Sequence, residues 1–492
     1  MPNNPGSIAD ASSALLERRL FVIVLALAGV AGLAAIWLYA QDALTLSHYD
    51  ARGHLVVSRR VVDSLTPGWR QLGAVWLPLP HLLNLVPVQW DWAYRTGIPG
   101  AIISSAILAW GLASLARCVV RSTGSVEAAL IGPILILANP NVLYLQSTPM
   151  TEPILFGLAL IATDAVARVL AGRGAAVSAG VSLAALVLTR YEGWLIAAAL
   201  VAIAAAIAWR RRRRLPAVVF SLPAGALLGF LVLSWASTGR WIASADFYVP
   251  DPQLLRQPAV VFDHFRRGVL DLGGYALVWG GAGGLIVVAA TAWRRPERWL
   301  FVTMFAAAAL PLWAFYQGHP YRVRYMMATV VALGVMAPFA VLVFPARLRL
   351  AAIVVMALLV TRERPPNDPE APMLQEAQWE TPFRQGRETV TAALAAQHDA
   401  TPILASMGSL GHYMQETSHA GFRLRDFLHE GNGDLWSEAL RAPRRSVRWV
   451  LIEGRAEGGD MLAALAERDP SFLEGFDRVS EGGGLVLYRR AD

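Results

Sequence analysis

Long apolar runs alternate with short arginine clusters over the first 360 residues. A bilayer core about 30 Å thick needs roughly 20 apolar residues in one helix, and about eleven runs approach that length. They cover residues 20–40, 98–119, 126–143, 152–170, 175–188, 194–209, 216–235, 272–293, 300–316, 325–344 and 348–360. This pattern predicts an α-helical polytopic membrane protein.

The pattern changes near Thr361, where Arg-Glu-Arg-Pro-Pro-Asn-Asp-Pro has the composition of a linker. Beyond it, helix-like segments at residues 388–397 and 461–468 are interleaved with strand-like segments at 402–406, 448–453 and 485–488. We therefore predict a transmembrane domain over residues 1–361 and a soluble α/β domain over residues 362–492.

Composition supports the membrane assignment and narrows the chemistry. Hydrophobic residues make up 55% and charged residues 16% of the chain, which is too apolar for one soluble core. The net charge of +7 would suit nucleic acid, but the basic residues stand between apolar runs. The sequence contains no lysine, which excludes Schiff-base chemistry. Cys118 is the only cysteine, which excludes an intrachain disulfide and a thiolate metal site.

Arginine clusters mark every second boundary between the apolar runs. They are Arg18 with Arg19, Arg117 with Arg121, Arg168 with Arg173, Arg210 to Arg214, Arg294 with Arg295 and Arg298, and Arg347 with Arg349. Positive charge favours the cytoplasmic side, so we expect a cytoplasmic N-terminus, an uncleaved first helix and an extracytoplasmic C-terminal domain. Two long loops, residues 41–97 and about 238–271, then lie outside, where loops of such length are usually functional.

Ionisable residues gather in four of the predicted outer connections. These are His48-Tyr49-Asp50 after the first helix, Glu152 before Pro153, Arg190-Tyr191-Glu192, and His319 to Arg324. A carboxylate there can act as a general base, and guanidiniums can bind a lipid-linked phosphate. Each residue also has a structural interpretation. Asp50 and Glu152 suit helix starts, Arg190 can pair with Glu192, Arg322 and Arg324 can anchor at lipid headgroups, and His319 can be an ordinary loop histidine.

Several of these segments resemble the GT-C glycosyltransferases, a superfamily that includes protein O-mannosyltransferases and lipid A aminoarabinose transferases. Asp50 in a long first outer loop, followed by Trp76-Leu-Pro78-Leu-Pro80-His81-Leu, resembles the first loop of that superfamily. Thr-Glu152-Pro and Arg190-Tyr-Glu192-Gly resemble short outer-loop motifs of its bacterial members. The resemblance extends from about residue 20 to residue 360. The chain departs from the common Asp-Glu pair of the first loop, because Tyr49 precedes and Ala51 follows Asp50.

The resemblance implies a GT-C-like fold and an inverting transfer of a sugar from a polyprenyl-phosphate donor to an acceptor hydroxyl. The implied catalytic acid/base is Asp50, with Asp91, Glu152 or Glu192 as candidates for a second carboxylate. Donor phosphate binding is assigned to Arg190, Arg322, Arg324 and His319, and the sugar or acceptor pocket to His48, Tyr49, His81, Tyr191 and Tyr321. We expect no cofactor and assign no metal ligands, while leaving a divalent metal open.

The expected partners are the donor lipid, membrane lipids and an envelope glycan, lipid or protein acceptor in a bacterial cytoplasmic membrane. The alternative functions are a polytopic transporter or lipid flippase, which would place ionisable residues at the bilayer midplane, and a non-catalytic envelope scaffold.

Overall fold

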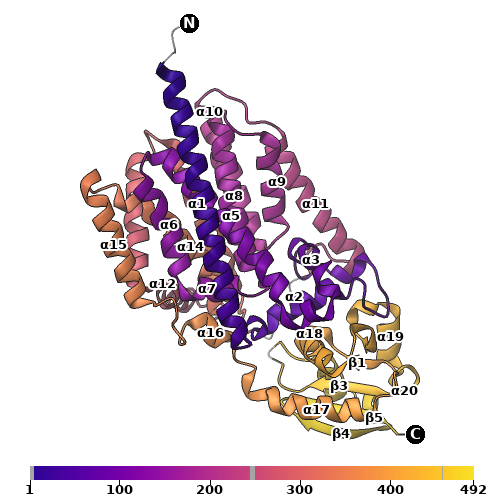
Figure 1. Ribbon diagram of the computed structural model, residues 1–492. Coiled ribbons are helices and arrows are strands. Elements are labelled where there is room, and N and C mark those ends of the chain that lie inside the picture. Colours follow the sequence, from indigo (N-terminus) through magenta and orange to yellow (C-terminus); the bar gives the residue numbers. More distant parts are fainter. Residues whose placement is uncertain (1–4, 244–249, 457, 492) are drawn as a thin grey trace.

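A computed structural model describes residues 5–243, 250–456 and 458–491 and contains a helical bundle beside a small α/β domain (Figure 1). The bundle helices after the first loop are α5 (Ile98–Thr123), α6 (Val126–Ala138), α7 (Pro140–Gln146), α8 (Glu152–Leu170), α9 (Ala176–Val187), α10 (Tyr191–Arg210), α11 (Val218–Thr238), α12 (Pro258–Thr291), η4 (Pro296–Ala308), α13 (Ala309–Tyr316), η5 (Val323–Met326), α14 (Met327–Val341) and α15 (Ala346–Glu363). They follow α1 (Pro5–Gln41).

All eleven predicted apolar runs lie in helices. Within residues 5–243, 250–456 and 458–491, eight helices are long and apolar enough to cross a membrane, and the bent pair α6–α7 would make a ninth. The other two runs form α9, which has only 12 residues, and α15, which carries charged residues at both ends. The chain is a multi-pass membrane protein.

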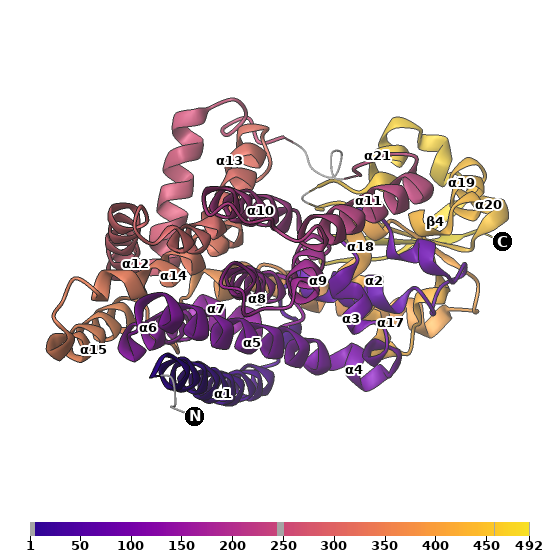
Figure 2. The same ribbon diagram turned by 90° about the horizontal axis from the view of Figure 1, so that it is seen from above.

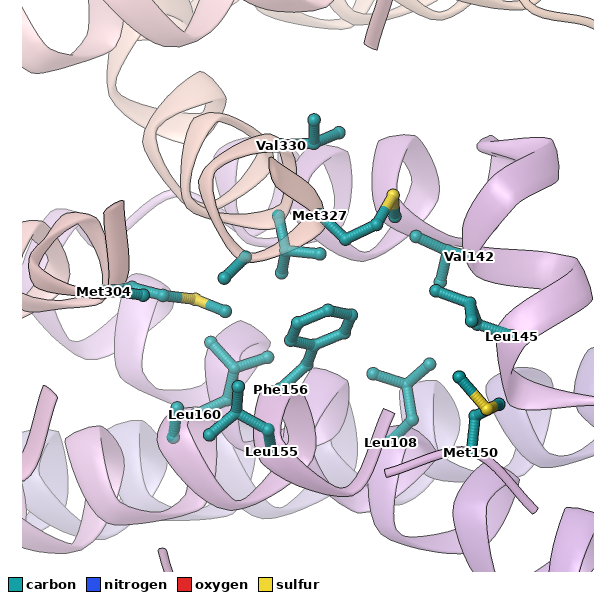
Figure 3. Packing of buried hydrophobic residues seen from close by; sticks show 14 of the residues in the cluster. Leu108, Val142, Leu145, Met150, Leu155, Phe156, Leu160, Met304, Met327 and Val330 are labelled. Carbon is teal, nitrogen blue, oxygen red and sulfur yellow. The ribbon is translucent and has the colours of Figure 1, made fainter. Parts of the chain in front are cut away.

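The outside of the bundle is apolar and the inside is closely packed. Helix α1 lies at the periphery against α5 (Figure 2) and exposes large side chains such as Leu27 and Val30. Such a surface suits lipid rather than water. In the interior, Phe156 of α8 lies among Leu108 of α5, Met304 of η4 and Met327 of α14 (Figure 3).

Helices α5 and α8 cross at glycines. A Cβ added to Gly157 would lie 2.3 Å from the carbonyl oxygen of Ile107, and one added to Gly111 would lie 2.5 Å from the Cα of Gly157. Small residues allow membrane helices to approach this closely. We expect Gly157→Ala to destabilise the protein by about 1–3 kcal/mol, because the backbone at Ile107 must move to make room for the methyl group.

The measurement is the thermal unfolding midpoint of the purified variant in detergent. The matched control is Gly225→Ala in α11, where an added Cβ meets no atom within 4 Å. An alanine there should leave the midpoint unchanged or raise it, since alanine is the better helix former. Equal midpoints for Gly157→Ala and wild type would contradict the close crossing.

Two helices of the bundle are interrupted, and their breaks meet. Helices α6 and α7 are bent by 74° at Asn139, and α12 is broken at Gly274, which has a φ of 73°. The side-chain amides of Asn139 and Asn141 donate to the carbonyl oxygen of Leu272, at 2.8 and 3.1 Å. A broken helix in a membrane leaves backbone groups without partners, and these amides supply one.

Ion pairs gather several of the arginine clusters at one end of the bundle, which we call the arginine end. Glu17 pairs with Arg121 at 2.7 Å and with Arg173 at 3.6 Å, and buried Asp164 accepts from Arg117 and Arg121. Arg117, Arg121 and Arg173, from two of the predicted clusters, therefore lie on one side, next to the Arg18–Arg19 pair that follows Glu17. Which membrane face that side occupies stays a prediction.

The first loop folds as a series of short helices at the opposite end, which we call the domain end. They are η1 (Leu44–Leu46), α2 (Tyr49–Arg59), η2 (Trp69–Leu72), α3 (Leu79–Asn84), η3 (Pro87–Gln89) and α4 (Asp91–Thr96). The other predicted loop, about 238–271, is shorter than expected, because α12 already begins at Pro258, a residue well suited to a first helical turn. Residues 244–249 of that loop lie outside the described structure.

The C-terminal part contains a five-stranded sheet of order β2-β1-β3-β5-β4, in which β1 pairs in parallel with β2 and β3, while β5 is antiparallel to β3 and β4. The strands are β1 (Ile403–Ala405), β2 (Phe427–Leu428), β3 (Trp449–Glu453), β4 (Phe476–Gly482) and β5 (Leu485–Arg490). The helical elements are α16 (Pro372–Ala377), η6 (Thr381–Phe383), α17 (Arg384–Gln397), α18 (Met407–Glu416), η7 (Thr417–Ala420), η8 (Leu424–Asp426), η9 (Glu430–Asn432), α19 (Asp434–Arg441), α20 (Pro443–Ser446), α21 (Met461–Arg468) and η10 (Pro470–Leu473). The five segments predicted from sequence are confirmed, and α18 packs against α2 of the first loop.

Candidate active site

Helix α2 places Asp50 at the domain end of the bundle. His48 caps this helix, and its Nδ1 accepts a hydrogen bond of 3.1 Å from the backbone N–H of Asp50. Nε2 of the same ring lies 3.2 Å from Nη1 of Arg324. Asp50 itself stands in the first turn, where the helix dipole favours a negative charge.

Asp50 forms an ion pair with Arg324, a residue distant in sequence. The carboxylate lies 2.5 Å from Nη1 of Arg324, and the two side chains are 13% and 7% exposed. Burial by itself would raise the pKa of Asp50, but the Arg324 guanidinium holds that pKa well below its usual value. The carboxylate is therefore ionised throughout the neutral range.

Arg190 forms a second buried cluster with two carboxylates. Its Nη1 donates to Glu152 at 2.9 Å and to the hydroxyl of Thr151 at 2.8 Å, and its Nη2 donates to Glu192 at 2.9 Å. Glu152 comes from the start of α8, whereas Arg190 and Glu192 form the turn into α10. One guanidinium therefore binds two helix starts together.

The two clusters lie close enough to influence each other. Burial would lower the pKa of Arg190, and the charge of Arg324 also lowers it, but Glu152 and Glu192 raise it above its ordinary value. The pKa of His54 in α2 responds to both clusters. Burial lowers this pKa, the charges of Arg190 and Arg324 lower it further, and the charge of Asp50 raises it in part. The four sequence segments thus meet at one end of the bundle, as predicted.

Other predicted residues lie around these clusters. His81 is buried in α3, with its Nε2 3.1 Å from Nδ1 of His54, and burial lowers the pKa of His81 to about 3. The ring of Tyr49 stacks on His48 with a centroid separation of 4.8 Å. The Tyr191 hydroxyl donates to the carbonyl of Val75 in the first loop at 3.1 Å.

The segment from His319 to Arg322 points partly away from Asp50. Nδ1 of His319 lies 2.8 Å from the carbonyl of Pro320, and burial lowers the pKa of this histidine. Tyr321 packs against His264 of α12 with a centroid separation of 5.4 Å. The Arg322 guanidinium stacks over the ring of Trp379 at 4.6 Å. Arg324, two residues beyond this segment, contacts Asp50 instead.

Glu376 completes the site and was not a sequence candidate. It lies in α16, beyond the last bundle helix, and accepts a hydrogen bond of 2.9 Å from the backbone N–H of Val323. Its carboxylate also faces His48 and Arg324. The local sequence Met-Leu-Gln-Glu-Ala contains no motif that predicts a site residue. The position of Glu376 in the site depends on contacts with Val323, His48 and Arg324, which are distant in the sequence.

The C-terminal domain also contacts the helix that bears Asp50. Arg52 of α2 pairs with Glu416 of α18, and Glu416 also lies 3.3 Å from the buried guanidinium of Arg387. Arg387 in turn pairs with Glu380 and lies 3.1 Å from His412. This polar network fixes α2 against the domain.

Within residues 5–243, 250–456 and 458–491, no group of three or more His, Cys, Asp or Glu side chains is arranged to hold a metal ion. The expectation that no cofactor is needed stays a prediction.

Two known structures are similar to this chain in fold. The chain is similar to ArnT from Cupriavidus metallidurans bound to undecaprenyl phosphate, at 15% identity and a TM-score of 0.56, over 93% of this chain and 97% of that one. It is also similar to the Archaeoglobus fulgidus oligosaccharyltransferase in the apo form, at 12% identity and a TM-score of 0.55, over 96% of this chain and 74% of that one. Both are GT-C superfamily members.

The chain has the GT-C fold. The similarity extends through the C-terminal domain, since more than nine-tenths of the chain is covered in each case. No protein-family profile matches the sequence, and no curated protein sequence matches it. The likeness to GT-C proteins is therefore one of architecture.

Proposed function

We propose that this chain is a membrane glycosyltransferase that transfers a sugar from a polyprenyl-phosphate carrier to an acceptor hydroxyl, with inversion. The observation that carries the proposal is the meeting of Asp50, Arg324 and Arg190 at one end of a GT-C fold. A similar structure, that of ArnT, contains undecaprenyl phosphate. The reaction needs a base and cationic groups for a phosphate, and this end of the bundle supplies both.

In this mechanism Asp50 accepts the proton of the acceptor hydroxyl while the oxygen attacks the anomeric carbon. The bond from that carbon to the phosphate oxygen breaks, and its electron pair leaves with the polyprenyl phosphate. Arg324 and Arg190 neutralise the negative charge that develops on the phosphate. A single displacement from the face opposite the leaving group inverts the anomeric centre. Glu152 and Glu192 are the nearby carboxylates that orient Arg190.

Donor binding would also make Asp50 a better base. The ion pair with Arg324 holds the pKa of Asp50 low, and a carboxylate of low pKa is a weak proton acceptor. A phosphate that draws Arg324 away from Asp50 removes part of this stabilisation, so the pKa of Asp50 rises. The acid is then most basic when donor is bound.

The arrangement of charge favours transfer on the extracytoplasmic face of a bacterial cytoplasmic membrane. The arginine end carries the clusters that face the cytoplasm under the positive-inside rule, so the domain end faces outward. The acceptor would then be an envelope glycan, lipid or protein.

Interrupted helices such as α6–α7 and α12 also occur in transporters. A transporter or flippase places its ionisable groups near the bilayer midplane. Here Asp50 lies outside the candidate spans, Arg190 directly precedes one, and Glu152, Glu192 and Arg324 stand in the first turns of theirs. This end-of-helix placement favours the transferase.

The experiment supplies the purified protein in lipid nanodiscs with radiolabelled undecaprenyl-phosphate-linked sugars and an envelope extract as acceptor. We expect label to move from the lipid to the acceptor, with release of undecaprenyl phosphate. Absence of transfer across hexose and pentose donors, combined with movement of intact donor between leaflets in proteoliposomes, would favour the flippase instead.

A further inference from the structure

The carboxylate of Glu376 lies in a buried cradle formed by Val323, His48 and Arg324. The backbone N–H of Val323 donates to Oε2 at 2.9 Å. Nε2 of His48 and Nε of Arg324 lie 3.5 and 3.8 Å from Oε1. Nε2 of His48 also lies 3.2 Å from Nη1 of Arg324. The Val323 N–H, the His48 ring and the Arg324 guanidinium thus surround one carboxylate.

Glu376 fills this cradle incompletely. Among the residues that the structure describes, Oε1 of Glu376 and Nε of Arg324 are buried and make no hydrogen bond, although they face each other. Their side chains are only 5% and 7% exposed. Buried polar atoms without partners are costly, so the cradle suits an anion with more oxygens or a longer reach. A phosphate group has both properties.

The helix that carries Glu376 is short and lies outside the candidate spans. Helix α16 has six residues and is connected to α15 by the proline-containing segment 364–371. It is held by the Met373 N–H, which donates to Asn141 at 3.0 Å, and by the buried side chains of Met373 and Ala377. Just after it, Trp379 stacks under Arg322. Because α16 lies outside the candidate spans, a rotation of the Glu376 side chain out of the cradle requires no movement of a span.

We infer that Glu376 occupies the subsite of the donor phosphate, so that this carboxylate and the phosphate of the carrier lipid compete for Val323, His48 and Arg324. The inference rests on the proposed function and adds the position of the phosphate. It also assigns Glu376 a role as a positioning residue. The carboxylate holds Arg324 while the site is empty, and its return to the cradle displaces the phosphorylated carrier after transfer.

The test measures the Kd of undecaprenyl phosphate for the full-length protein in nanodiscs, without sugar or acceptor. Glu376→Gln removes the competing charge but retains an oxygen that can accept from Val323. We expect the variant to bind undecaprenyl phosphate about tenfold more tightly than wild type. Undecaprenyl phosphate should also inhibit transfer more strongly in the variant. A merely structural role would weaken binding instead.

A second variant and a control keep the outcomes distinct. Glu376→Asp retains the charge but shortens the side chain by one methylene, so undecaprenyl phosphate should bind more tightly by a smaller factor. If Glu376→Gln does not fold, the Kd of this variant tests the inference. Exposed Glu388 on α17 provides the control Glu388→Gln, with an unchanged Kd. If the wild type binds undecaprenyl phosphate and both Glu376 variants bind it equally or more weakly, the inference about Glu376 is wrong while the proposed function stands. Failure of the wild type to bind undecaprenyl phosphate overturns the proposed function as well.

Discussion

Asp50→Asn is expected to reduce the rate of sugar transfer by about 10²–10⁴-fold, the usual contribution of a general base. Asparagine keeps the size of the side chain and can still accept a hydrogen bond from Arg324, but it cannot accept the acceptor's proton. Donor binding should persist, because Arg324 loses a competing carboxylate and remains beside Glu376. Loss of turnover with retained Kd for undecaprenyl phosphate is the expected signature.

The measurement compares single-turnover transfer and thermal midpoint for wild type, Asp50→Asn and Asp42→Asn. Asp42 is an exposed aspartate that follows α1 and provides a matched change of charge. It should leave transfer unchanged. If Asp50→Asn transfers sugar at the wild-type rate while folding normally, Asp50 is a helix-start residue and another group is the base.

Arg190→Gln has the second large expected effect, on both stability and transfer. The side chains of Glu152 and Glu192 are 3% and 9% exposed and share Arg190 as their cationic partner. Removal of one member of a buried ion pair typically costs about 3–5 kcal/mol, because the remaining charge stays desolvated. We expect a lower thermal midpoint and loss of transfer.

A double variant separates these effects. Arg190→Gln with Glu192→Gln removes one positive and one negative charge, so the local net charge of the cluster is unchanged. We expect the thermal midpoint to recover most of the loss, whereas transfer stays low because the phosphate lacks Arg190. Recovery of transfer together with stability would show that Arg190 only joins α8 to α10.

The bundle could be predicted from the sequence because each membrane helix is encoded by a continuous apolar segment. Each span needs a long apolar run, and clusters of arginine separate such runs along the sequence. The α6–α7 bend was missed, since residues 126–143 were predicted as one apolar run although Asn139, Pro140 and Asn141 interrupt it. The partner of the Asn139 amide, the carbonyl of Leu272 in α12, is far away in the chain. The start of α12 was also missed, because residues 258–271 carry several charged side chains.

The candidate site was predictable only in part. Asp50, Glu152, Arg190 and Arg324 share the domain end, and topology alone placed them on one side. The sequence could not show which guanidinium meets which carboxylate, since Asp50 and Arg324 approach only after the bundle closes. Arg322 and Arg324 looked equivalent, yet one stacks on Trp379 and the other contacts Asp50.

Glu376, His54 and the Arg52–Glu416 contact were missed for a common reason. Each matters through a partner far away in the chain, and a single sequence has no signal for long-range pairing. A second carboxylate was expected from Asp91, Glu152 or Glu192. Asp91 instead pairs with Arg59 at 2.6 Å within the first loop.

The docking of α16 has a consequence for building hybrid enzymes. A chimera that joins this bundle to a foreign C-terminal domain at the linker near Thr361 would discard Glu376 and the Met373–Asn141 contact together. The junction of a chimera should therefore lie beyond Trp379, so that α16 stays with the bundle that it contacts. Residues on α2 that face the grafted part, such as Arg52, would then need to be matched to the incoming surface.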